Sequence, residues 1–106
     1  MKTDTIKIND KTVILKELPA TEGYTTAMRF RKAFAERDAD EMRRCLITML
    51  KVCELDLGDG RTSVLDNDLI INQHFNVSEL LELQDVLINF NFGFLMDGDH
   101  SNSSIE

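Results

Sequence analysis

Two cysteines and two histidines are the residues of this sequence best suited to metal binding or redox chemistry. Cys45 and Cys53 lie eight positions apart, which separates them by about 12 Å if the segment is helical. A disulfide needs Cα atoms within about 7 Å, so these two cysteines are not expected to pair with each other. Neither belongs to a Cys-x-x-Cys pair, and His74 and His100 lack partners at zinc-ligand spacing. We therefore expect buried thiols, no metal and no cofactor.

The segment 54–63 carries two glycines and three acidic residues, so its spacing has to be compared with that of a calcium loop. An EF-hand loop needs acidic or amide side chains at positions 1, 3 and 5 and a glutamate at position 12. Counted from Asp56, positions 3 and 5 are Gly58 and Gly60, and position 12 is Asn67. The pattern does not fit a calcium site, and we expect a loop here.

Motifs of catalysis are missing from the sequence. It contains no Gly-x-Ser-x-Gly, no phosphate-binding loop and no dinucleotide glycine pattern. Nothing singles out a catalytic pair among the 19 acidic residues, and His74, beside Phe75, is interpreted as a histidine of a helix end or the core. We expect no catalytic residues and no enzymatic activity.

Charge is distributed unevenly along the chain, whose net charge is −7. Residues 1–53 hold 11 basic and 8 acidic residues, whereas residues 54–106 hold one basic residue, Arg61, and 11 acidic ones. The acidic half disfavours nucleic-acid binding, which needs cations for the phosphates. It either keeps the protein soluble or faces a basic partner. The basic cluster Arg29, Arg31 and Lys32 is interpreted as a solvated helix face.

Membrane segments are not expected, because no apolar run exceeds three residues and a span needs roughly 20. The N-terminus, Met1-Lys2-Thr3-Asp4, has no apolar stretch behind its lysine, as a secretory signal would. We therefore expect a cytoplasmic protein, in the host cytoplasm if a phage encodes it.

The N-terminal part predicts a hairpin followed by two helices. Residues 5–8 and 12–15 alternate in polarity around Asn9-Asp10-Lys11, which is typical of two short strands and a turn, and Pro19 ends this unit. A first helix is expected from a cap at Thr21 or Thr25 to about Arg37. The side chains expected on the apolar side of this helix are Tyr24, Ala27, Met28, Phe34 and Ala35. Asp38-x-x-Glu41 resembles a capping box before a second helix, whose apolar stripe is Met42, Cys45, Leu46, Met49, Leu50 and Cys53.

One short helical turn and one long helix are predicted in the acidic half. Asp66 or Asn67 can cap a short helical turn, and Asn76-Val77-Ser78-Glu79 opens a long helix that we expect to end near Asn91. The apolar stripe of that helix is Leu80, Leu83, Val86, Leu87 and Phe90.

The phenylalanine-rich segment after this helix is the candidate partner-binding site. Phe90, Phe92 and Phe94 alternate with Asn91 and Gly93, a period typical of an extended segment. Together with Leu95 and Met96 they either complete the core or form an exposed stripe for another chain. Residues 97–106 are polar and are expected to form a disordered tail. These expectations define one small domain, 1–96, of the α+β class, mainly helical, with the N-terminal β-hairpin packed on about three amphipathic helices.

The order of these features resembles the phage tail assembly chaperones. The residues that carry the resemblance are the opening hairpin over 6–15, the stretch 16–20 (Lys-Glu-Leu-Pro-Ala) and the closing helix over 80–90. The resemblance covers roughly residues 5–92 and includes no motif of catalysis or ligand binding. It implies a phage or prophage protein that keeps the long tape-measure protein soluble and recruits tail-tube subunits.

Two other classes of protein remain open. One is an acidic inhibitor or nucleic-acid mimic that binds a basic enzyme, which the charge of residues 54–106 would support. The other is a regulatory subunit, as in toxin–antitoxin pairs, that would use the same apolar stripes for stoichiometric pairing. A homo-oligomer is compatible with all of these.

Overall fold

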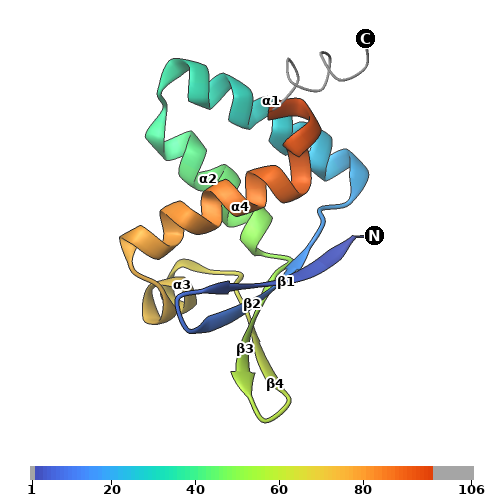
Figure 1. The fold of residues 1–106 in the computed structure, drawn as a ribbon. Helices are drawn as coiled ribbons and strands as arrows, with labels where there is room; N and C mark the ends of the chain where they lie inside the picture. The colour runs from blue at the N-terminus through green and yellow to red at the C-terminus, as the bar shows by residue number, and fades with distance from the viewer. Residues whose placement is uncertain (1, 97–106) are drawn as a thin grey trace.

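The predicted N-terminal hairpin is present and forms half of a larger sheet. We describe a computed structural model, which covers residues 2–96 and, of residues 94–96, the backbone alone. Strands β1 (Thr3–Ile8) and β2 (Lys11–Lys16) pair antiparallel, with Ile6 opposite Val13. Asn9 begins the turn at φ 57°, a left-handed conformation that asparagine tolerates. Two further strands, β3 (Glu54–Gly58) and β4 (Arg61–Val64), complete a sheet of order β1-β2-β3-β4 (Figure 1).

The prediction of a loop over 54–63 is therefore wrong, because these residues form a second hairpin. Leu55 lies opposite Val13 of β2 and is buried with it, so burial against the first hairpin stabilises the strand. The glycines and one of the acids occupy only the tip, where Gly58, Asp59 and Gly60 all have positive φ. Figure 1 shows this hairpin extending away from the helices.

The first two helices follow the N-terminal hairpin directly. Helix α1 (Ala20–Glu36) begins after Pro19 and has no side-chain cap, so the predicted caps at Thr21 and Thr25 are wrong. The fixed φ of Pro19 is compatible with a helix start, and its carbonyl accepts the Gly23 N–H at 2.7 Å. Helix α2 (Ala39–Leu50) begins as predicted, with the Asp38 carboxylate accepting the backbone N–H of Glu41. The second half of the predicted capping box is wrong, because the Asp38 N–H donates to the Ala33 carbonyl and the Glu41 carboxylate accepts from Arg29.

Asparagine caps open the last two helices, as expected. Asn67 accepts the Ile70 N–H at the start of α3 (Asp68–His74). At the start of α4 (Val77–Met96), Asn76 and Glu79 bond each other's backbone N–H groups reciprocally. The regular part of α4 ends at Asn91, as predicted, because Phe92 is non-helical at φ −133° and forms a kink, but a second short helical segment beyond the kink continues to Met96.

One apolar core joins the sheet to the helices, with α4 crossing in front of α2 in Figure 1. Its largest contributors are Ile8, Val13, Leu15, Phe30, Cys45, Met49, Leu50, Leu65, Ile71, Leu83 and Leu87. The apolar stripes predicted for the second and the last helix are thus buried or half-buried. The α+β, mainly helical class is confirmed. The predicted short helical turn is the helix α3, and the second hairpin was not predicted. The predicted disordered tail, 97–106, lies outside the described residues.

Candidate protein-binding site

The predicted phenylalanine stripe is not an extended segment, because helix lies on both sides of the kink at Phe92. Phe92 is buried, at 3 % exposure, and belongs to the core. Phe90 is half-buried, and the ammonium of Lys2 lies 4.5 Å from the centre of its ring. The side chains of Phe94, Leu95 and Met96 lie outside the described part of the chain. The two described side chains of the predicted site, Phe90 and Phe92, therefore do not form an exposed stripe.

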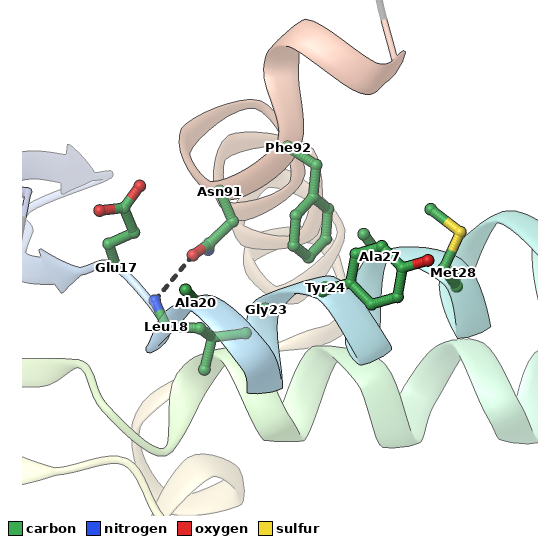
Figure 2. A pocket seen from close by; sticks show the side chains of 9 residues that line it. All are labelled: Glu17, Leu18, Ala20, Gly23, Tyr24, Ala27, Met28, Asn91 and Phe92. Carbon is green, nitrogen blue, oxygen red and sulfur yellow. Dashed lines mark hydrogen bonds between the residues drawn. The ribbon is translucent and has the colours of Figure 1, made fainter.

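An open groove lies where this part of α4 meets the start of α1. Its volume is about 440 Å³, and Leu18, Tyr24, Ala27, Met28 and Phe92 form most of its apolar lining. Figure 2 shows Phe92 directed from α4 toward α1, with Tyr24 and Met28 along the same edge.

Asn91 connects the two walls of the groove. Its side-chain oxygen accepts the Leu18 N–H at 3.0 Å, and its amide nitrogen donates to the Leu87 carbonyl at 3.0 Å. Because Leu18 precedes α1 and Leu87 belongs to α4, this one side chain fixes the start of α1 against α4 (Figure 2). The neighbouring residue, Phe92, departs from helical geometry and fills the space between the helices.

The exposed side of α1 extends this groove along the helix. Tyr24 is 69 % exposed, Met28 36 % and Phe34 62 %. At 3.6 residues per turn these three side chains fall within a sector of roughly 120°, and we call them the α1 apolar face. The Phe34 ring stacks on the buried Phe30 ring, with centroids 6.1 Å apart, so it is held against the helix surface.

The sequence predicts one apolar side for the first helix. In the structure the residues of that side are divided between the core and the solvent. The core receives Ala27, which lies within the sector of the α1 apolar face, together with Thr26, Phe30 and Ala33 from the adjacent sector of the helix. Phe30 was not predicted as a core residue, although its position between Tyr24 and Phe34 in the sequence could have indicated it. One helix with large apolar groups over so wide a sector cannot bury all of them in a small core.

The basic cluster on α1 is partly engaged in an ion pair with α2. Arg29 donates to Glu41, and this contact lowers the pKa of the Glu41 carboxyl. Arg31 and Lys32 are exposed, and neither forms an ion pair with another of residues 2–93. Arg31 lies within the sector of the α1 apolar face, and Lys32 lies about 40° outside it, one turn after Met28.

A buried polar cluster fixes the start of α4 to the tip of the first hairpin. Glu79 is 3 % exposed and accepts hydrogen bonds from Lys11 at 2.9 Å, Asn9 at 2.7 Å and the Asn76 N–H at 2.9 Å. These donors, Lys11 first, lower the pKa of Glu79 to about 2. The sequence indicated only the cap, because Lys11 is 68 residues away along the chain.

The remaining candidates for chemistry are separated from one another. Cys45 and Cys53 are unpaired and buried, and burial raises the pKa of both thiols. His74 is half-buried at the end of α3. Within the described residues, no three His, Cys, Asp or Glu side chains lie where they could hold a metal ion. No helix in that same part of the chain is long and apolar enough to cross a membrane.

The strongest candidate site is therefore a surface for another protein, made of the groove and the α1 apolar face. Comparison with known proteins adds no relative to this description: no family model, no curated protein and no solved structure matches the chain.

Proposed function

We propose that this protein acts without catalysis, by binding an apolar segment of another protein and keeping that protein soluble. The observation that carries the proposal is the α1 apolar face, where Tyr24 and Phe34 are both more than 60 % exposed beside an open apolar groove. Large exposed apolar groups gathered around a groove are typical of protein-binding surfaces.

The distribution of charge supports a solubilising role. Residues 54–106 carry 11 acidic residues and one basic residue, so a complex covered by this protein would gain negative charge. Net charge of one sign keeps complexes apart in solution. In this proposal the partner corresponds to the tape-measure protein of the tail assembly chaperones that the sequence resembles, with tail-tube subunits as a second partner.

A nucleic-acid mimic is the second candidate function. It is supported by the same acidic half of the chain, residues 54–106. Three of the acids there are engaged in internal ion pairs, Glu54 with Lys16, Glu79 with Lys11 and, at 3.7 Å, Asp68 with Arg43. The remaining described acids are spread over the second hairpin, the segment before α3, and α4. An array spaced like phosphates is not evident among them, so the apolar surface is the better supported site.

A pull-down from the producing cells, at low and high salt, tests the proposal. The variant carries Tyr24→Ser and Phe34→Ser, whereas the matched control carries Leu57→Ser and Val64→Ser, two exposed apolar residues of the second hairpin. Phe92 is unsuitable for this test, because it is buried and its loss would damage the fold.

We expect a long helical protein or a tail-tube subunit to be retained at high salt by the wild type and the control, and lost by the variant. Co-expression should keep that partner soluble. A basic enzyme that is released at high salt and is indifferent to the variant would instead establish the mimic.

A further inference from the structure

We propose that the chain associates with a second copy of itself, head to tail, through α1 of one copy and the first half of α4 of the next. The contact uses two rows of side chains, one on each helix. This inference shares the α1 apolar face with the proposed function but does not depend on it, because self-association is a property of the purified chain.

The two rows have the same spacing. On α1 the row is Tyr24, Met28 and Lys32, and on α4 it is Val77, Leu81 and Asp85, each in steps of four residues. In both rows two exposed apolar side chains are followed by one exposed charged side chain. Val77 is 74 % and Leu81 58 % exposed, so the α4 row is as unprotected as the α1 row.

Helices pack most often by placing rows of this spacing beside each other. Side chains four residues apart form ridges on a helix surface, and interdigitation of two such ridges gives the commonest class of helix packing. When the α1 and α4 rows run in the same direction, the apolar pairs meet each other and Lys32 meets Asp85.

The charges beside the rows are complementary as well. Arg31 adjoins the α1 row and Glu82 adjoins the α4 row, and both are exposed. None of Arg31, Lys32, Glu82 and Asp85 forms an ion pair with another of residues 2–93, so the contact would not break an existing pair there. Opposite charges at matching positions favour this pairing over α1 on α1 or α4 on α4, because self-pairing in the same direction would bring like charges together and antiparallel self-pairing would place each charge opposite an apolar side chain.

The contact is heterologous, because two different surfaces of the chain meet. A copy that uses its α1 row still presents its α4 row, so copies can add further until a ring closes. Two helix faces of a few turns bury less than the roughly 1,600 Å² of a standard interface. We therefore expect weak association, with a dissociation constant in the micromolar range. This weak self-association would cover the exposed apolar side chains of the α1 row until a partner displaces the neighbouring copy.

Mixing two variants of the purified full-length chain tests this arrangement. One variant carries Tyr24→Ser and Met28→Ser, and the other carries Val77→Ser and Leu81→Ser. A control carries the substitutions Leu57→Ser and Val64→Ser in the second hairpin. All six positions are at least 36 % exposed, and circular dichroism checks that each variant keeps the fold. Sedimentation velocity up to about 500 µM measures association well above the expected dissociation constant.

We expect the wild type and the control to associate, each row variant alone to stay monomeric, and an equimolar mixture of the row variants to form dimers of one copy of each. Lys32→Glu should weaken wild-type association roughly threefold, and Asp85→Lys in the same chain should restore it. A monomeric wild type, or a mixture that stays monomeric, would overturn the proposal. Association of the α4-row variant alone would overturn it too, and would indicate that α1 pairs with α1. None of these three results would affect capture of a foreign partner, which the pull-down measures separately.

Discussion

Asn91 gives the sharpest test of how the groove is built, because its side chain joins the start of α1 to α4. Its oxygen accepts the N–H of Leu18, a residue that is only 5 % exposed. Asn91→Ala removes this acceptor and leaves the Leu18 N–H with little access to water. The same substitution removes the hydrogen bond from Asn91 to the Leu87 carbonyl.

The size of the effect follows from these contacts. A buried donor left without an acceptor costs about 1–3 kcal/mol. Alanine has a higher helix propensity than asparagine and offsets up to about 0.5 kcal/mol of that cost. We therefore expect Asn91→Ala to lower the free energy of unfolding by about 0.5–2.5 kcal/mol. For a domain of this size the melting temperature should fall by roughly 2–20 °C.

Urea unfolding, followed by circular dichroism, measures this difference. The control is Asn89→Ala, because Asn89 is exposed on the same helix and its side chain forms no hydrogen bond with the described residues. We expect the control to unfold at the wild-type midpoint or slightly above it, and Asn91→Ala to unfold at a lower urea concentration with an unchanged slope. Equal midpoints for the two variants would refute the role assigned to Asn91.

Two further predictions concern titratable groups. The pKa of Glu79 is lowered from 4.5 to about 2 by Lys11 and its other donors, so the stabilisation is present above about pH 4.5 and is lost as the pH falls toward 2. Lys11→Met should therefore flatten the fall of the melting temperature between pH 5 and pH 2, and an unchanged pH profile would contradict this assignment. Burial raises the pKa of Cys45 and Cys53, so a thiol reagent at pH 8 should modify the native protein at least roughly tenfold more slowly than the protein in guanidinium. Equal rates in the two conditions would show that the thiols are accessible.

Features that depend on neighbouring residues could be predicted from the sequence. Asp38, Asn67 and Asn76 cap their helices as expected, because a cap needs only a short polar side chain and a backbone N–H two or three residues later. The stripe on α2 was equally readable, since Cys45 and Met49 share one face of a regular helix and both are buried.

Features that depend on distant partners could not be predicted. β3 is a strand because Leu55 is buried against Val13, 42 positions earlier in the chain, whereas its own composition resembles a loop. The side chain of Phe92 packs between α4, to which it belongs, and α1. Its period-two spacing with Phe90 therefore led to the wrong prediction of an extended segment. The exposure of Tyr24 depends on which side of α1 the core covers, and the sequence of α1 alone does not determine that.

The most direct test of the central claim is photo-crosslinking from position 34, within the α1 apolar face. A benzophenone amino acid replaces the 62 % exposed Phe34 in the producing cells, and a second protein carries it in place of Leu57 on the second hairpin. If the α1 apolar face binds the partner, position 34 should crosslink to the same foreign protein that the wild type retains at high salt, and position 57 should not. A retained partner that crosslinks only from position 57 would contradict the site proposed here.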